Sequence, residues 1–323
     1  AYLAGIRVAR REILIANAYH LFLRPGADIV AKAGGLHHFM GWSRPIVTDS
    51  GGFQIFSLSG TRVCGDGVVF TSHLDGSRHL LTPEDSMRIQ ELLGADIAMA
   101  FDYCPRNWND PDEIAESTTT TIRWAERCRR AHRGRQQTLF GIIQGGTCPD
   151  FRQTCIHALE EIGFPGYGIG GLSIGEPFEE TLATVRLCVD LLPESRVRYV
   201  MGVGEPVQML SLIAEGIDLF DCGMPTRIAR HGTALTSRGR ITIRNGQYKD
   251  DRRPLDPGCS CAVCTGWTRA YLRHLFNAGE MLGPRLISLH NLVFVARLLE
   301  RAREAISEGR FAALKSSFET EYN

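Results

Sequence analysis

The chain has 323 residues, of which 44% are hydrophobic and 22% charged, and its 36 basic and 36 acidic side chains cancel. Overall charge therefore excludes a strongly basic nucleic-acid-binding protein, so any phosphate contact must use a local basic patch. We expect a cytoplasmic protein without a signal peptide or a membrane span, because no run approaches about 18 apolar residues. Ten cysteines without a secretory signal also argue against a disulfide framework.

Apolar β-type runs alternate with helical patterns up to about residue 222. The predicted strands are, in chain order, 12–17, 45–49, 96–102, 139–144, 167–172, 198–203 and 217–221. The first clear helix begins after Thr82, which acts as N-cap before Pro83, and others run near 112–133, 150–162, 179–191 and 207–215. A hairpin over 68–81, turning at Asp75-Gly76, is an excursion, and two long helices close the chain, the last over 288–321.

This alternation predicts a parallel α/β architecture. Two of its strands end in aspartates that run directly into turn-forming residues, Asp49 before Ser50-Gly51-Gly52 and Asp221 before Gly223 and Pro225. Carboxylates at the carboxyl ends of parallel strands point to the edge where α/β proteins bind ligands. Two of them can divide the roles of nucleophile and general acid/base at a glycosidic carbon. The alternative for each aspartate alone is a turn or capping role.

Three clustered cysteines follow a Pro-Gly turn, in the spacing C-x-C-x2-C: Cys259, Cys261 and Cys264. Three thiolates and one imidazole make a closed tetrahedral set, which is typical of a structural zinc site. His274 and His290 are both candidates for the imidazole. We expect one structural Zn²⁺ per chain.

The chain resembles the tRNA-guanine transglycosylases, from about Ile13 to the C-terminus. The resemblance rests on eight segments in order and on the cysteine cluster after them. The segments are ANAYHLFLRPG (16–26), VTDSGGFQ (47–54), SHLDGSRH (72–79), GADIAMAFDYC (94–104), FGIIQGG (140–146), GIGGLSIGE (168–176), YVMGVGEP (199–206) and FDCGMPTR (220–227). The family's histidine stands in a matching His-Asn context, so the resemblance selects His290 as the fourth metal ligand.

The resemblance implies a (β/α)8 TIM-type barrel with an inserted zinc-binding subdomain near the C-terminus. Only seven strands are found, so we expect the N-terminal strand or strands of the family to be missing here. The expected domains are a catalytic (β/α) barrel over 1–253, the zinc-binding subdomain over 254–292, and a C-terminal helix over 293–323 that packs on the barrel.

The resemblance implies an enzyme that exchanges guanine at the anticodon wobble position for a 7-deazaguanine, as in queuosine biosynthesis. Asp221 would be the nucleophile that holds the tRNA as a covalent ribosyl ester, and Asp49 the general acid/base. The partners implied are tRNAs of the Tyr, His, Asn and Asp type and the free 7-deazaguanine base. No nucleotide cofactor is needed, because one glycosidic bond replaces another.

Base recognition would come from other strand ends. Asp102 resembles the acceptor for the purine edge, and Phe53 and Met201 would sandwich the ring. The other residues expected to contact the base are Ser50, Gln144, Gly171, Leu172 and Gly202. Arg227 and Arg230 are the first candidates for contacts with tRNA phosphates. The basic run Arg238, Arg240, Arg244, Lys249, Arg252 and Arg253 is either a further part of that surface or a solvated face.

Archaeal members of the family carry an extra C-terminal module, whereas this chain stops after one terminal helix, so the resemblance favours the bacterial-type enzyme, which uses 7-aminomethyl-7-deazaguanine. Ile174 would also narrow the base-binding pocket and exclude the larger base queuine. The alternatives are a queuine-using enzyme, a barrel glycoside hydrolase, and a zinc-stapled non-catalytic tRNA-binding subunit. We also expect a homodimer. The residues that resemble the family's dimer contact are Phe39, Trp42, Trp267, Tyr271 and His274.

Overall fold

The computed structural model describes residues 13–134 and 136–322. Its main sheet has seven strands that are hydrogen-bonded in chain order, and β1 to β9 pair in parallel. The strands are β1 (Leu14–Ala16), β2 (Ile46–Thr48), β6 (Ile97–Met99), β7 (Thr138–Ile143), β8 (Gly166–Ile169), β9 (Val197–Val200) and β10 (Leu219–Phe220). All seven predicted strands are confirmed.

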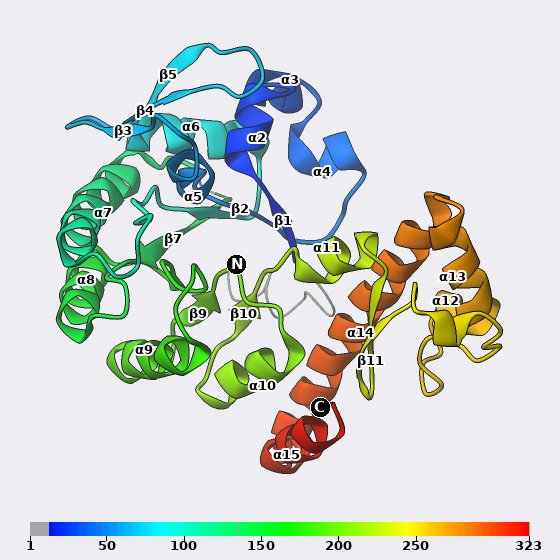
Figure 1. Cartoon of the computed structure of the whole chain (residues 1–323). Coiled ribbons are helices and arrows are strands. Elements are labelled where there is room, and N and C mark those ends of the chain that lie inside the picture. The colour runs from blue at the N-terminus through cyan, green and yellow to red at the C-terminus, as the bar shows by residue number, and fades with distance from the viewer. Residues whose placement is uncertain (1–12, 135, 323) are drawn as a thin grey trace. The chain divides into compact units, whose positions relative to one another are not determined.

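The sheet is curled, with helices along its outside (Figure 1). Helices α6 (Pro83–Leu93), α7 (Pro111–Ala131), α8 (Pro149–Ile162) and α9 (Phe178–Leu191) alternate with the strands. Apolar side chains from several strands of this sheet, among them Val47 of β2, Met99 of β6 and Ile142 of β7, form a buried core cluster. This is the architecture of a (β/α)8 barrel, as predicted. The expectation of missing N-terminal strands concerns residues 1–12, which lie outside the described residues.

Local sequence explains where the outer helices begin. Thr82 caps α6 in a capping box: its hydroxyl accepts the N–H of Asp85, and Asp85 accepts the N–H of Thr82. Proline occupies the first position of α6, α7 and α8, where no N–H is required.

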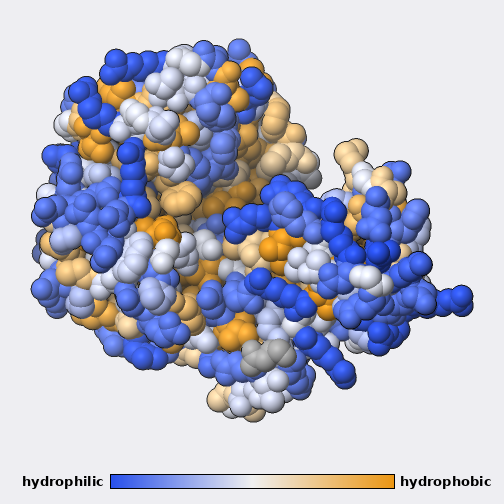
Figure 2. Space-filling view, in the orientation of Figure 1, coloured by the Kyte–Doolittle hydropathy of each residue, from blue (hydrophilic) through white to orange (hydrophobic). Residues whose placement is uncertain are grey.

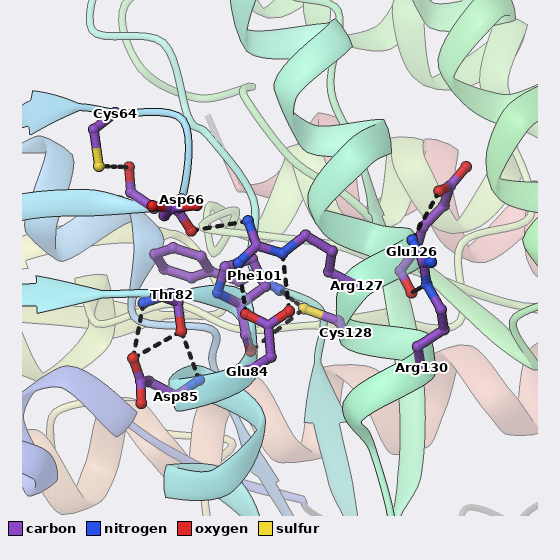
Figure 3. A network of polar contacts seen from close by, with 12 residues as sticks. Cys64, Asp66, Thr82, Glu84, Asp85, Phe101, Glu126, Arg127, Cys128 and Arg130 are labelled. Atoms are coloured by element: carbon purple, nitrogen blue, oxygen red, sulfur yellow. Dashed lines mark hydrogen bonds and ion pairs between the residues drawn. The ribbon is translucent and has the colours of Figure 1, made fainter.

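Short helices and a small antiparallel sheet fill the early connections. Helices α2 (Ala18–Leu23), α3 (Ala27–Lys32) and α4 (Gly35–Met40) join β1 to β2, and α5 (Gly52–Phe56) follows β2. Strands β3 (Arg62–Val63), β4 (Val68–Thr71) and β5 (Arg78–Leu81) form the predicted hairpin with one extra strand. Arg127 of α7 binds Glu84 (2.6 Å) and the Asp66 carbonyl (2.9 Å), which ties this excursion to α6 and α7 (Figure 3).

The chain divides into two compact units. Unit 1 comprises Ala1–Met201 and Glu215–Leu219, and unit 2 comprises Gly202–Ala214 and Phe220–Asn323. Unit 2 contains α10 (Pro206–Ala214), α11 (Met224–Arg230), β11 (Thr233–Thr236), β12 (Gly239–Thr242), a 3-10 turn (Gly246–Tyr248), α12 (Ala262–Gly266), α13 (Arg269–Asn277), α14 (Leu282–Ser307) and α15 (Phe311–Glu321). The domain boundaries expected at residues 253 and 292 fall inside unit 2 and stay a prediction.

The single helix predicted over 288–321 is wrong. Helix α14 starts earlier and ends at Ser307, and α15 is a separate helix. Gly309 adopts φ +68°, and the Arg310 N–H returns to the Ala305 carbonyl at 2.8 Å. A left-handed glycine of this kind closes the end of a helix, because it satisfies the last free carbonyls.

Among the described helices, α14 is long and apolar enough to cross a membrane by length and composition alone. This departs from the expectation that no segment comes near that limit. In unit 2, however, Leu286 and Ile287 of α14 belong to one buried core cluster and Leu298 to another. The helix also packs against α11 and β11. One face of α14 therefore lies in the core of unit 2, although only 33% of the candidate span is buried.

Candidate active site and metal cluster

Three predicted base-recognition residues meet at the carboxyl ends of β2, β6 and β7, in unit 1. The Ser50 hydroxyl donates to one oxygen of Asp102 at 2.8 Å, and the Gln144 amide donates to the other oxygen at 2.8 Å. All three side chains are buried. The predicted grouping of these residues is therefore observed, and Asp102 is its centre.

Burial makes Asp102 an unusual carboxylate. Loss of solvation raises its pKa above the ordinary aspartate value, and the hydrogen bonds from Gln144 and Ser50 oppose that rise. Both donors are neutral, so among the described residues this carboxylate accepts hydrogen bonds without an ion-pair partner. Such a group can accept hydrogen bonds from the N–H edge of a purine.

Asp49 is buried and held in one orientation. Its Oδ2 accepts a hydrogen bond from the Asn17 amide at 2.6 Å, and its Oδ1 accepts one from the Ala18 N–H at 2.8 Å. Asn17 follows β1 as Asp49 follows β2, and Ala16 is paired with Thr48 in the sheet. Sequence reasoning gave Asn17 no role, although an Asn between a strand and a helix was a visible signal; it also caps α2 through the His20 N–H.

Gln90 and Ser86 of α6 support the same strand ends and were also missed. Gln90 accepts hydrogen bonds from the Thr48 hydroxyl and the Met99 N–H, each at 2.9 Å, and donates to the Met99 carbonyl. The Ser86 hydroxyl donates to the Ser50 carbonyl at 3.0 Å. One helix therefore ties the two neighbours of Asp49, through the Thr48 hydroxyl and the Ser50 carbonyl, to the Met99 backbone before Asp102. In the sequence these are ordinary polar positions of an amphipathic helix, so no local pattern marks them.

Of the remaining predicted base contacts, Gly171 lies against Gln144. Gly171 has φ +63°, and a Cβ there would lie 2.3 Å from Gln144 Oε1, so another residue would be strained and would displace the Gln144 amide. Gln144 Oε1 is buried without a hydrogen-bond partner among the described residues, so it is an available acceptor. Leu172 is buried, Met201 packs against the inner core cluster, and Phe53 is 55% exposed. The predicted sandwich of a base between Phe53 and Met201 stays a prediction.

Glu176 organises the loop that carries Ile174. Its carboxylate accepts hydrogen bonds from the N–H groups of Ser173 and Ile174 and, at 2.6 Å, from the Thr181 hydroxyl. Burial alone would raise the pKa of Glu176, but these hydrogen bonds outweigh it and lower the pKa. Ile174 is half-buried in this braced loop.

In unit 2, Asp221 follows β10 and stands before α11. One of its oxygens accepts the Gly202 N–H at 3.1 Å, and the side chain is half-buried. Gly202, a predicted base contact, is therefore a neighbour of Asp221. Arg227 and Arg230 are both exposed on α11.

The basic run 238–253 is partly neutralised within unit 2. Arg240 forms an ion pair with Glu205, Arg253 pairs with Asp251 at 2.8 Å, and Arg244 stacks on the Phe276 ring. Hydrophilic residues cover much of the visible face around β11 and α12 (Figure 2). Arg240 and Arg253 therefore form ion pairs, whereas Arg238, Lys249 and Arg252 are exposed. The interpretation of the run as part of a tRNA-binding surface stays a prediction.

The four predicted metal ligands come together in unit 2. The thiol sulfurs of Cys259, Cys261 and Cys264 and a ring nitrogen of His290 all lie within 4.8 Å of one another. His290 Nδ1 is 3.3 Å from the Cys264 sulfur and 3.5 Å from the Cys261 sulfur. His274, the competing ligand, is outside this group and lies against Tyr271 on α13.

The surroundings of the cluster fit a bound metal ion. His290 Nε2 lies 2.7 Å from the Leu235 carbonyl, which can only accept, so the proton belongs on Nε2 and the Nδ1 lone pair faces the sulfurs. Arg297 donates to the Cys259 sulfur at 3.4 Å. Burial raises the pKa of the Cys264 thiol, and a metal ion would reverse this by binding the thiolate.

Asn291, the neighbour of His290, links the cluster to α11. Its amide nitrogen donates to the Pro225 carbonyl at 2.9 Å and to the Thr233 carbonyl, and its oxygen accepts the Leu235 N–H. The helix that carries the metal-binding histidine thus holds the helix that follows Asp221. This contact was not predicted.

Comparison with known proteins agrees with these observations. The family model described as queuine tRNA-ribosyltransferase matches residues 5–323. A queuine tRNA-ribosyltransferase of Moorella thermoacetica is 53% identical over 97% of this chain and 84% of its own length. Those of Halothermothrix orenii and Acetivibrio thermocellus are each 52% identical, over 97% and 95% of this chain and 84% and 83% of their own lengths. The chain belongs to the queuine tRNA-ribosyltransferase family.

Proposed function

We propose that this protein is a tRNA-guanine transglycosylase that exchanges guanine at the anticodon wobble position for 7-aminomethyl-7-deazaguanine. The observation that carries the proposal is the buried Asp102, whose two oxygens stand beside Ser50 and Gln144 at adjoining strand ends. A carboxylate there can take the N1–H and exocyclic amine of a guanine-like base. Family membership supports the same reaction class.

The chemistry needs one nucleophile and one proton carrier. Asp221 attacks ribose C1′, the bond from C1′ to guanine N9 breaks, and an ester joins the tRNA to the enzyme. Asp49 gives a proton to the leaving guanine. It then takes a proton from the incoming base, which attacks C1′ and releases the Asp221 carboxylate. Two displacements at one carbon give net retention.

The binding roles follow the same division. Gln144, Gly171 and Leu172 face the O6 and N7 side of the base, and Phe53 and Met201 its two faces. Guanine must leave the anticodon stack to enter such a pocket. Arg227 and Arg230, exposed on α11, contact the tRNA phosphates. The substrates are tRNAs of the Tyr, His, Asn and Asp type.

The metal in the cluster is zinc. Three thiols and an imidazole that face one centre form the donor set that zinc prefers, and a fully occupied set has no position for substrate. Cys259, Cys261, Cys264 and His290 would hold it, and the ion would fix the fold of unit 2.

The protein works in the cytoplasm as a homodimer. Exposed apolar side chains support an assembly surface on each of two helices: Phe39 on α4 is 45% exposed and Tyr271 on α13 is 41% exposed. Sedimentation at micromolar concentration tests this, and a monomer would overturn the dimer.

The deciding experiment is exchange of labelled guanine with unmodified tRNA. A transglycosylase incorporates the label without net loss of bases from the tRNA, and the free 7-aminomethyl base competes with it. Release of base without replacement would instead indicate a hydrolase. Tight tRNA binding without exchange would indicate a non-catalytic subunit, and competition by queuine would favour the queuine-using enzyme.

A further inference from the structure

Arg152 is a fully buried cation that none of the roles above uses. It lies in the first turn of α8, and its side chain has no exposed surface. Burial of a guanidinium is costly unless the surroundings compensate its charge. Here burial lowers the pKa of Arg152. Packing alone does not require a charged side chain at this buried position, so the role of Arg152 lies in its hydrogen bonds.

The hydrogen bonds of Arg152 join two strand ends. Its Nε donates to the Gly146 carbonyl at 2.7 Å, Nη1 to the Ile143 carbonyl at 2.9 Å, and Nη2 to the Gly170 carbonyl at 2.8 Å. Ile143 directly precedes Gln144, and Gly170 directly precedes Gly171. One rigid guanidinium therefore holds the backbone on both sides of the contact between Gln144 and Gly171.

That contact leaves little freedom. Gly171 leaves no room for a Cβ against Gln144 Oε1, and Gly145 would place a Cβ 2.7 Å from the Arg152 backbone nitrogen. A small shift of either strand end would move the Gln144 amide away from Asp102, since a hydrogen bond weakens steeply with misalignment. The planar fork of arginine can bridge three fixed carbonyls, which the single ammonium of lysine does not reproduce.

We propose that Arg152 is a positioning residue for base recognition: its guanidinium clamps the ends of β7 and β8 so that Gln144 and the Gly171 backbone face the base in one arrangement. The inference rests on the proposed function, because the base is the ligand of that pocket. Arg152 does not itself touch the substrate.

Arg198 provides a matched control. It is also a buried arginine, and its Nη2 donates to the Leu192 carbonyl at 2.9 Å and the Val189 carbonyl at 3.3 Å. These carbonyls close the end of α9 that leads into β9, away from the carboxyl ends of the strands. Arg198 is thus chemically equivalent to Arg152 and also buried, but among the described residues its side-chain hydrogen bonds do not reach the predicted base contacts.

The experiment compares Arg152→Lys with Arg198→Lys. Initial rates of guanine exchange are measured against guanine concentration at saturating tRNA, and guanine binding without tRNA is measured by calorimetry. We expect Arg152→Lys to raise the KM and Kd for guanine about tenfold, the loss of one or two well-placed hydrogen bonds, with kcat changed less. Arg198→Lys should leave the KM and Kd for guanine within about twofold of the values of the unmutated enzyme. Its Tm should fall by about as much as that of Arg152→Lys.

Equal guanine affinity in Arg152→Lys and the unmutated protein would overturn the proposal, and so would an equal loss in Arg198→Lys. If the unmutated protein neither binds nor exchanges guanine, the proposed function is wrong, and the inference about Arg152, which rests on it, is wrong as well.

If Arg152→Lys does not fold, amide hydrogen exchange of the unmutated protein, with and without guanine, tests the proposal instead. Saturating guanine should slow exchange in the first turns of α8, which carry Arg152 but no base contact, and leave the end of α9 unchanged. If guanine leaves the hydrogen exchange of α8 unchanged, Arg152 does not respond to the bound base and the proposal is wrong.

Discussion

The pocket around Asp102 and the cysteine cluster satisfy their polar groups in different ways. In the pocket, side chains satisfy one another: Asp102 accepts from Ser50 and Gln144 at 2.8 Å each. In the cluster, four ligand atoms converge within 4.8 Å, with sulfur-to-nitrogen distances of 3.3–4.0 Å that make weak hydrogen bonds at best. The surroundings of Asp102 are therefore a preformed hydrogen-bond network, whereas the cluster is a set of ligand atoms that could hold a metal ion.

Substitutions in the two regions should therefore differ in their effects on stability and on activity. Changes in the pocket should alter binding and chemistry more than folding, because backbone contacts from Gln90 and Arg152 hold the strand ends independently. Changes in the cluster should alter folding first, since metal binding is coupled to the order of the ligands.

Removal of the metal should have the largest effect. Cys261→Ala or His290→Ala should lower the metal content from about one ion per chain to near zero and destabilise unit 2 by about 4 kcal/mol or more. Mass spectrometry of bound metal and thermal unfolding check this. Cys188→Ala, at a buried cysteine of α9 outside the cluster, is the control and should keep its metal. A stable, metal-free His290→Ala would contradict the assignment.

Replacement of the nucleophile should abolish chemistry without unfolding the protein. Asp221→Asn should prevent the denaturation-resistant tRNA adduct and slow exchange by on the order of 10⁴-fold, because an amide is a poor nucleophile. Denaturing gels and exchange rates are the measurements. Asp218→Asn removes a carboxylate from the same segment, one that accepts the Arg198 N–H, and should still form the adduct. An adduct on Asp221→Asn would show that another residue attacks C1′.

The buried Asp102 carboxylate should lower the stability of the folded protein and strengthen guanine binding. Burial raises its pKa in the folded protein, so its contribution to stability is fully present below the unfolded carboxyl pKa and is lost as pH rises through the folded value. The Tm of the unmutated protein minus that of Asp102→Asn should therefore fall as pH rises above about 4. The KM of the variant for guanine should rise at least about tenfold.

Asp75 is the control for this pH profile. The hydrogen bond from the Ser77 side chain, with others, lowers its pKa to about 2, so its stability contribution is lost only as pH falls through that value. The Tm difference for Asp75→Asn should be flat over the same range. A flat profile for Asp102→Asn would contradict the burial effect.

The smallest expected effect is on the choice between the two incoming bases, 7-aminomethyl-7-deazaguanine and queuine. Ile174→Gly should admit queuine, because removing a branched side chain from a braced loop opens space for its ring, while guanine exchange stays within about threefold. Competition of queuine and 7-aminomethyl-7-deazaguanine against labelled guanine measures this. Ile174→Val keeps the branch and should still exclude queuine. Efficient use of queuine by the unmutated protein would show that Ile174 is not the gate.

Some of this molecule follows from local sequence. The period of the apolar runs predicted all seven strands, because a buried parallel strand is a short apolar run bounded by turn residues. The C-x-C-x2-C spacing predicted the metal cluster, since nearby thiolates can meet around one ion with little help from the fold. Even the break at Gly309, which the prediction missed, is a local signal of a helix end.

Other features depend on tertiary structure, because they join residues far apart in the chain. Asn17 meets Asp49 only because β1 pairs with β2 in register, and Arg152 bridges two strand ends only because β7 pairs with β8. The charge of the basic run was likewise decided by neighbours: Glu205, distant in sequence, neutralises Arg240. The sequence by itself therefore determined which side chains stand at the strand ends and which thiols can bind a metal. Only the folded sheet decided which groups hold those side chains in place, since hydrogen-bond partners are chosen by distance in space.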